Sequence, residues 1–183
     1  MASLQDDAAS AEDITSPIFF WRETERPYGC FSQWYSQPFK ETNEAGDSVT
    51  FETAEQYMMY HKAVLFHDPD IAAQILNAKG GREQRALGRK VHDFDQDIWA
   101  ANRSRIVRDG NILKFSENAK LRQTLLETGD RELVEASPSD RIWGIGYGAK
   151  NAPSKRENWG LNLLGKALME VRKHIREEEE EKK

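Results

Sequence analysis

The 183-residue sequence has few of the residues that build disulfide or metal sites. Its single cysteine, Cys30, excludes an internal disulfide framework and fits a reducing compartment. The histidines are scattered and no cysteine pair accompanies them, so the sequence has no spacing typical of a metal site. Cys30 has no histidine beside it, and no serine stands in a nucleophile-elbow sequence. We therefore expect neither a bound metal nor a cysteine or serine nucleophile.

Long hydrophobic runs are also missing. No apolar stretch approaches the roughly 18 residues that a membrane-spanning helix needs. The N-terminus lacks the basic and hydrophobic regions of a signal peptide. We expect a soluble, intracellular protein without a membrane partner, located in the cytoplasm, with a nuclear location left open.

The acidic residues are concentrated at the two ends of the chain, which makes the formal net charge of −5 a poor guide to its body. We predict a disordered acidic tail at 1–15 and a charged C-terminal tail at 177–183, either disordered or a fraying helix end. The segment 16–176 between them is mildly basic and forms one domain. Such a charge suits an anionic ligand such as a phosphate, but it is too weak for a nonspecific duplex binder.

The hydrophobic fraction is low at 38%, yet aromatic residues make up 10%, so we expect an aromatic-rich core or pocket. Short runs of strand formers predict strands at 18–21, 48–51 and 133–136. Apolar spacing and capping residues predict helices from Thr53 and at 70–78, 83–90, 95–114, 118–127 and 163–175. The aromatic segment 31–39 is expected to be an ordered loop. The fold class is therefore α+β, predominantly helical, with a small sheet component.

The helix that begins at Thr53 carries a carboxylate and an amine on one face. Thr53 and Gln56 form a capping box, which places Glu55 in the first turn. Lys62 comes seven residues later, within about 20° of Glu55 and roughly 10 Å further along the axis. The methionines at 58–59 lie between them. A lysine in apolar surroundings is a candidate nucleophile. Spacing alone favours the structural alternative, in which its stem covers the methionines while its amine reaches water.

Gly144, Gly146 and Gly148 stand at alternate positions, where side chains would obstruct a close approach of backbone. A phosphate-binding loop and a tightly packed turn both explain this spacing. The sequence around them matches neither the dinucleotide fingerprint nor the phosphate-binding loop. The glycines alone therefore do not choose between the two interpretations.

A series of short motifs from about Phe19 to Arg172 resembles the YbiA/NADAR family in its order. These motifs are Phe31-Ser32-Gln33-Trp34-Tyr35 with Pro38-Phe39, Thr53-Ala54-Glu55-Gln56-Tyr57 to Lys62, Gly88-Arg89, Trp99 with Arg103, Lys114-Phe115 with Asn118, Leu133-Val134-Glu135-Ala136-Ser137, Asp140-Arg141-Ile142-Trp143-Gly144, and Asn162-Leu163-Leu164-Gly165-Lys166-Ala167-Leu168-Met169. Gln33 is a departure, since the family commonly has Asn there, and it bears on the details of recognition at this loop.

The resemblance implies a compact YbiA-like single domain with N-glycosidase activity and no metal or cofactor. Family members cleave N-ribosyl bonds, either of ADP-ribosylated guanine or of ribosylamino-pyrimidine phosphates in riboflavin synthesis. The family's chemistry gives Lys62 the role of a nucleophile that forms a Schiff base with the opened ribose. Glu55 and Asp140 are then candidates for proton transfer. Glu55 may instead stabilise the helix start, and Asp140 may simply form a turn.

The same resemblance suggests residues that bind the substrate. Aromatic side chains can stack on a base or ribose, and arginines can bind diphosphate oxygens. Core packing for the tryptophans, ion pairs for the arginines and a helix cap for Asn162 are the structural alternatives. The candidates are Phe20, Ser32, Trp34, Arg89, Trp99, Arg103, Trp143, Tyr147 and Asn162.

The leading functional hypothesis is hydrolysis of ADP-ribosylated guanine, with single-stranded nucleic acid as one context. The alternatives are an N-glycosidase of riboflavin intermediates and a noncatalytic module that binds ADP-ribose. The pair Lys62 and Glu55 favours an enzyme, because a binding module needs no buried amine. We expect a monomer whose partner is ADP-ribose or ADP-ribosylated guanine, a substrate that derives from NAD.

Overall fold

The computed structural model describes residues 15–182, so the predicted tail at 1–15 lies almost wholly outside the described residues. The elements are, in chain order, β1 (Ile18–Phe20), the 3-10 helix η1 (Tyr28–Phe31), β2 (Phe39–Thr42), β3 (Ser48–Phe51), α1 (Ala54–Leu65), α2 (Pro69–Asn77), α3 (Gly80–Gly88), α4 (Gln96–Ser116), α5 (Ala119–Leu126), β4 (Leu133–Glu135), the 3-10 helix η2 (Pro153–Asn158) and α6 (Leu163–Glu181). The predominantly helical α+β prediction is confirmed. No helix within residues 15–182 is both long and apolar enough to cross a bilayer.

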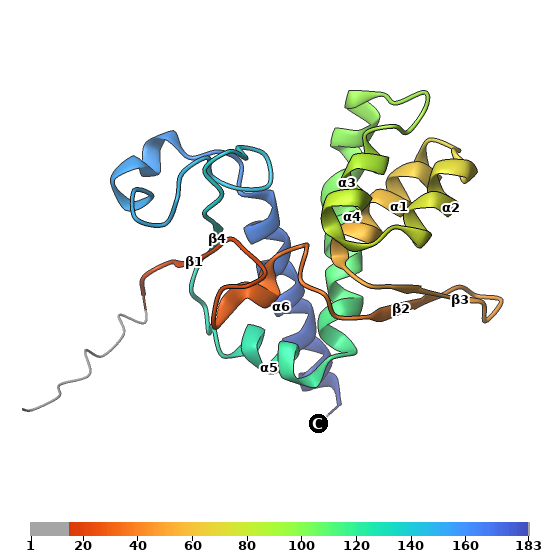
Figure 1. Ribbon diagram of the computed structural model, residues 1–183. Helices are drawn as coiled ribbons and strands as arrows, with labels where there is room; N and C mark the ends of the chain where they lie inside the picture. Colours follow the sequence, from red (N-terminus) through yellow and green to blue (C-terminus); the bar gives the residue numbers. More distant parts are fainter. Residues whose placement is uncertain (1–14, 183) are drawn as a thin grey trace, which may run out of the picture.

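The strands form two separate pairs. β1 and β4 pair in parallel, with Ile18 opposite Leu133 and Phe20 opposite Glu135. β2 and β3 form an antiparallel hairpin that reaches away from the helices (Figure 1). The sequence did not predict β2, because its Lys40 and Glu41 lie on a ribbon open to solvent and leave no apolar alternation.

The helices begin where the capping residues predict, with one exception. The Thr53 hydroxyl accepts a hydrogen bond from the Gln56 backbone N–H at 3.0 Å, and α1 starts at Ala54. The exception is α3, which starts at Gly80, whereas the glycine pair was expected to end the preceding helix and the next helix to start at Glu83. A Glu83 carboxylate oxygen accepts a 2.7 Å hydrogen bond from the Lys79 backbone N–H. This bond gives a partner to one of the backbone donors that a helix start leaves free.

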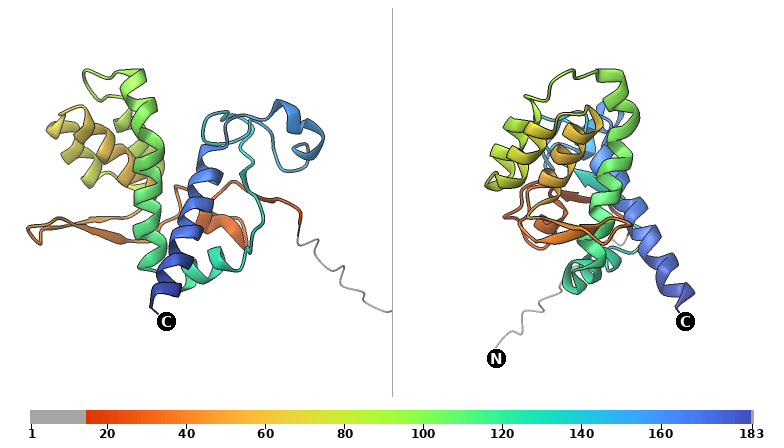
Figure 2. Two further views of the ribbon diagram at one scale, coloured as in Figure 1. Left: turned by 180° about the vertical axis from the view of Figure 1, so that it is seen from behind. Right: turned by 90° about the vertical axis from the view of Figure 1, so that its right-hand side faces the viewer.

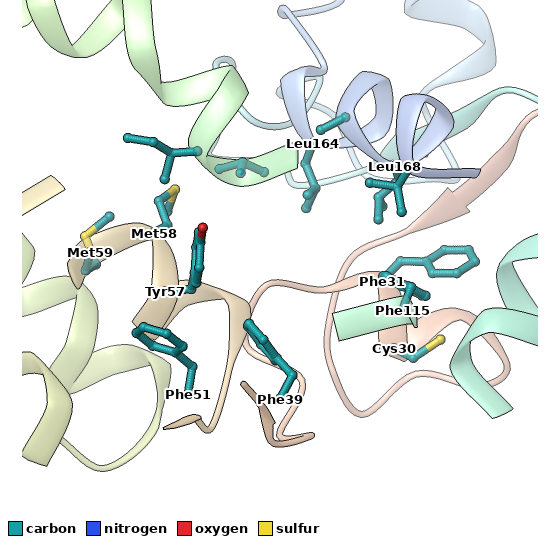
Figure 3. Close-up of a cluster of buried hydrophobic side chains, with 14 of the residues drawn as sticks. Cys30, Phe31, Phe39, Phe51, Tyr57, Met58, Met59, Phe115, Leu164 and Leu168 are labelled. Carbon is teal, nitrogen blue, oxygen red and sulfur yellow. The ribbon is translucent and has the colours of Figure 1, made fainter. Parts of the chain in front are cut away.

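α4 and α6 pack against each other through the middle of the molecule (Figure 2). In Figure 1, α1, α2 and α3 lie on one side of this pair, and β1, β4 and the 140–160 segment lie on the other. The core between them is rich in aromatic residues, as predicted. Figure 3 shows Phe39 and Phe51 of the hairpin beside Tyr57 of α1.

α6 continues to Glu181, so the segment after 176 is helical and not a disordered tail. Ion pairs one turn apart join Lys173 to Glu177 and Lys182 to Glu178. Arg122 of α5 also binds Glu179 at 3.0 Å. Such pairs stabilise a helix end modestly, and here they explain how an acidic run remains helical.

Candidate active site

A cavity of about 540 Å³ opens between the two sides of the fold. Its walls come from α1, α3 and α4 on one side, and from the ends of β1 and β4 with the 137–143 segment on the other. The side chains that matter for chemistry are those of Trp21, Ser32, Trp34, Glu55, Lys62, Arg82, Arg85, Arg89, Trp99, Glu135, Asp140 and Trp143.

The amine of Lys62 lies half-buried in this cavity. Its Nζ donates a 2.8 Å hydrogen bond to the backbone carbonyl of Gly88 and lies 4.1 Å from the ring centroid of Phe94. Burial lowers the pKa of Lys62 below its usual value, and the positive charge of Arg89 lowers it further. Within residues 15–182 no carboxylate forms an ion pair with this amine. These surroundings make the Lys62 amine easier to deprotonate, and so more available as a nucleophile, than a lysine amine in water.

Glu55 lies in the same cavity, in the first turn of α1, and is only 4% exposed. Its backbone N–H donates to the Gln33 carbonyl at 2.9 Å, which joins the helix start to the loop before β2. Burial raises the pKa of Glu55 to about 7, and Arg85, a hydrogen bond with Trp34 and Arg89 oppose that rise. Glu55 is therefore able to exchange a proton near neutral pH.

Glu135 is another carboxyl group in the cavity, and it was not among the predicted site residues. It is the last residue of β4. Burial raises its pKa to about 8, and the negative charges of Asp140 and Glu55 contribute to the rise. The sequence carries only a weak sign of it, an acid at the end of an apolar strand within the motif Leu133–Ser137.

Asp140 lies near Glu135 and also forms a turn. Its Oδ1 accepts hydrogen bonds from the backbone N–H groups of Ile142 at 2.8 Å and Trp143 at 2.9 Å. The turn-forming interpretation is therefore correct for one oxygen atom. Because the residue also borders the cavity, its carboxylate adds negative charge beside Glu55 and Glu135.

A buried lysine holds the loop that carries Ser32 and Trp34. Lys114 of α4 is 0% exposed, and its Nζ donates to the carbonyls of Cys30 at 2.7 Å and Ser32 at 3.0 Å. Burial lowers the pKa of Lys114 to about 7. These bonds satisfy two buried carbonyls and hold the loop against the core.

The ring of Trp34 packs on the start of α3. A Cβ atom added at Gly81 would lie 2.5 Å from the Trp34 Cγ, a distance that no side chain tolerates. Glycine at this position thus lets the tryptophan lie flat against the helix and border the cavity.

Three arginines line one wall of the cavity. Arg82, Arg85 and Arg89 are spaced three and four residues apart, which places them on one face of α3 and its C-terminal cap. All three are exposed, and none forms an ion pair within residues 15–182. The ion-pair alternative is therefore not observed for Arg89. Only Arg89 was predicted. The expected helix at 83–90 left out Arg82, and Arg85 was not singled out.

The comparisons with known proteins agree with this geometry. The family model described as "NADAR domain" matches residues 19–176. The chain belongs to the NADAR family. The expected family resemblance is therefore confirmed.

An N-glycosidase of Acanthamoeba polyphaga mimivirus is 47% identical over 144 residues, covering 78% of this NADAR chain and 85% of the viral protein. The NMR structure of Escherichia coli YbiA superimposes with a TM-score of 0.71 and 27% identity, covering 90% of this chain and 87% of YbiA. A chloroplastic riboflavin biosynthesis protein of Zea mays is 34% identical over 155 residues, but these represent 23% of its length. The fold is thus that of YbiA.

The structure brings most of the predicted site residues of this NADAR chain into the cavity. Those that line it are Lys62, Glu55, Asp140, Ser32, Trp34, Arg89, Trp99 and Trp143. Trp99 is nevertheless 8% exposed and belongs to the core as well, with its ring centroid 5.6 Å from Lys62 Nζ. Their chemical roles stay predictions.

Four predicted binding residues lie outside this cavity. Phe20 is a core residue, edge to face with Phe31 at 5.5 Å. Arg103 lies one turn beyond Trp99 on α4, outside the cavity wall. Tyr147 packs on a small separate cluster around Ile145.

The fourth, Asn162, is neither a ligand of the cavity nor a side-chain cap of α6. Its side chain joins β4 instead, because its amide donates to the Leu133 carbonyl at 2.9 Å and its Oδ1 accepts from the Glu135 N–H at 3.0 Å. It occupies a left-handed conformation with φ 50° just before the helix. Its effect on the cavity is therefore indirect, through the backbone of Glu135.

The alternate glycines form a tightly packed turn and do not line the cavity. A Cβ atom at Gly144 would lie 2.7 Å from the carbonyl oxygen of Glu135, so only glycine permits this approach. This close approach supports the packed-turn interpretation at Gly144, and the cavity gives the phosphate-binding interpretation no support. Within residues 15–182 no cluster of three potential metal ligands occurs.

Proposed function

We propose that this protein hydrolyses the N-ribosyl bond between ADP-ribose and the exocyclic amine of guanine, through an imine on Lys62. The mimivirus relative and the YbiA proteins are named N-glycosidases, and membership of their family supports a glycosyl-bond hydrolase. The specific substrate and the imine are our proposal.

The observation that carries the proposal is the shared cavity of Lys62 and Glu55. A half-buried amine with a lowered pKa and a buried carboxyl with a raised pKa face one space, and neither neutralises the other by an ion pair. A surface lysine that merely covers its neighbours has no such environment. A nucleophile with a nearby proton acceptor is the arrangement that imine formation requires.

The reaction proceeds through an opened ribose. A proton is donated to the ribose ring oxygen, the bond from this oxygen to C1 breaks, and C1 becomes doubly bonded to the base amine. The neutral Lys62 amine adds to C1 and loses a proton to a carboxylate. The base amine gains a proton and leaves, so that Lys62 holds the sugar as an imine. Water then adds to C1, and the bond to Lys62 breaks to return the amine and release ADP-ribose.

Glu55 is suited to accept the proton from Lys62. Arg85 and Trp34 stabilise its anionic form, so it is partly ionised at neutral pH despite its burial. Asp140 accepts hydrogen bonds from two backbone N–H groups at its Oδ1, which fixes its carboxyl group at the edge of the cavity. Its role is to stabilise cationic intermediates formed on Lys62 nearby.

The arginines of α3 supply an anion site of suitable size. Three exposed guanidinium groups border this cavity, and each can donate paired hydrogen bonds to phosphate oxygens. A diphosphate uses all three, whereas a single phosphate uses one or two. This excess of cations favours an ADP-ribosyl substrate. Trp34 and Trp143 border the same cavity and offer ring faces for the base.

A second candidate is hydrolysis of a ribosylamino-pyrimidine phosphate. The match to part of a maize protein named for riboflavin biosynthesis favours it, since the same domain type occurs in that pathway protein. The Lys62 chemistry would be identical. The two candidate substrates differ only in their number of phosphates and in the size of the base.

A paired turnover assay separates the two candidates. The purified protein is incubated with ADP-ribosylated guanosine, with the same modification in a single-stranded oligonucleotide, and with the ribosylamino-pyrimidine phosphate. Release of ADP-ribose with a kcat/KM at least about tenfold above that for the pyrimidine substrate supports the proposal. Turnover of the pyrimidine substrate alone would contradict it and favour the second candidate.

A further inference from the structure

Glu135 is held in place by its backbone on three sides. It pairs with Phe20 in the β1–β4 register, its N–H donates to Asn162 at 3.0 Å, and its carbonyl accepts from the Ile145 N–H at 3.0 Å. The close approach of Gly144 completes this enclosure. These contacts fix the backbone of Glu135 and therefore the position from which its side chain enters the cavity.

The carboxyl of Glu135 has an atom without a protein partner. Its Oε2 is fully buried and forms no hydrogen bond. A buried polar atom left unpaired is costly, so its presence in a cavity is typical of a group that binds or reacts with a ligand. Glu135 lines the cavity that contains Lys62.

The surroundings of this carboxyl disfavour its anion. Negative charges face it from Asp140 in the following loop and Glu55 of α1. Arg85 of α3 opposes them, and Lys62, Arg82, Arg89, Arg22 and Glu23 are the other charged groups that border the cavity. Burial is the largest contribution to a pKa of about 8, so the carboxyl keeps its proton at neutral pH.

We propose that Glu135 is the general acid of the reaction, which donates its proton to the ribose ring oxygen as the ring opens. This inference rests on the proposed function. The O–H bond of the carboxyl breaks, a new O–H bond forms on the sugar, and the bond between C1 and the ring oxygen breaks. Glu135 becomes a carboxylate and regains a proton from solvent before the next turnover.

Glu55 and Asp140 are less suited to this step. Oδ1 of Asp140 is already engaged in the turn by hydrogen bonds from the backbone N–H groups of Ile142 and Trp143. Glu55 has the positive charges of Arg85 and Arg89 and the Trp34 hydrogen bond, and all three lower its pKa relative to burial alone. A pair of carboxyls with different affinities for a proton divides the work, with Glu135 as the acid and Glu55 as the base.

The test measures kcat and KM of the full chain for ADP-ribosylated guanosine between pH 5.5 and 9.5. The variants are Glu135→Gln, Glu135→Asp and the control Glu132→Gln, whose side chain pairs with Arg156 outside the cavity. The wild-type rate should fall as pH rises above about 8, because the acid form is lost. Glu135→Gln should lower kcat by about 100-fold or more, with KM nearly unchanged, and remove this alkaline limb.

Glu135→Asp should retain the alkaline limb at a reduced rate, and Glu132→Gln should behave as wild type. Wild-type kcat and the same alkaline limb in a folded Glu135→Gln would overturn the inference while leaving the proposed function intact. If Glu135→Gln has no melting transition, Glu135→Asp decides instead. A wild-type kcat together with loss of the alkaline limb in Glu135→Asp would contradict an acid at this position. Absence of ADP-ribose release by the wild-type protein would overturn both.

Discussion

The Nζ of Lys62 and the backbone carbonyl of Gly88 are joined by a 2.8 Å hydrogen bond that links α1 to the end of α3. A neutral amine has two N–H bonds and one lone pair, so this bond directs one hydrogen to the carbonyl and leaves the lone pair for an electrophile. The same link places the nucleophile beside Arg89, the cap residue after Gly88. The reactive amine and the arginine wall thus lie next to each other, where α1 contacts the end of α3.

The arginine wall predicts a charge-dependent affinity for the diphosphate. Arg85→Gln or Arg82→Gln should raise KM for ADP-ribosylated guanosine by about tenfold, because one charge-assisted hydrogen bond contributes about 1.5 to 3 kcal/mol. The control is Arg105→Gln, on α4 and outside the cavity wall. Initial-rate kinetics at two salt concentrations measure the effect, and equal KM values for Arg85→Gln and the control would contradict an anion site.

The packing of Trp34 on Gly81 predicts a strict requirement for glycine. Gly81→Ala should displace the indole, since the new methyl would lie 2.5 Å from its Cγ. We expect a loss of about 1 to 3 kcal/mol in unfolding free energy from overpacking and a lower affinity for substrate. The matched control is Gly148→Ala, where the nearest atom is 3.7 Å away. Urea denaturation and substrate titration measure both properties, and a Gly81→Ala protein as stable as this control would refute the packing.

The buried amine of Lys114 predicts a structural effect that reaches the cavity. Lys114→Met keeps the apolar stem but leaves the carbonyls of Cys30 and Ser32 without their donor. We expect a destabilisation of about 2 to 4 kcal/mol and a higher KM, because the Ser32–Trp34 loop loses its support. Lys120→Met, on the exposed face of α5, is the control. Chemical denaturation decides, and the prediction is wrong if both variants unfold at the same denaturant concentration.

Much of the site was predictable from local sequence. The Thr53 cap and the 3.6-residue period placed Glu55 and Lys62 on one face, and both side chains border the same cavity. Their neighbours on α3 were partly missed, since Gly80 and Gly81 looked like a helix end. The structure shows that this pair starts α3 and gives room to Trp34.

Glu135 was not predictable in this way, because its position depends on pairing between distant segments. β1 and β4 pair in parallel although α1 to α5 lie between them in the sequence. No local periodicity predicts a contact between such distant segments. Asn162 shows the same limit. Its place before α6 indicated a helix cap, whereas its side chain bonds to the backbone of β4.

The most direct test of the central claim is reduction of the imine on Lys62. The protein is incubated with ADP-ribosylated guanosine and borohydride, digested, and the peptides are identified by mass spectrometry. Lys62→Arg is the matched control, because it keeps a positive charge and a donor for Gly88 but forms no imine. We predict a reduced sugar adduct on Lys62 in the wild-type protein, with no adduct and no ADP-ribose release in the variant. Release of ADP-ribose by Lys62→Arg at the wild-type rate would contradict the account.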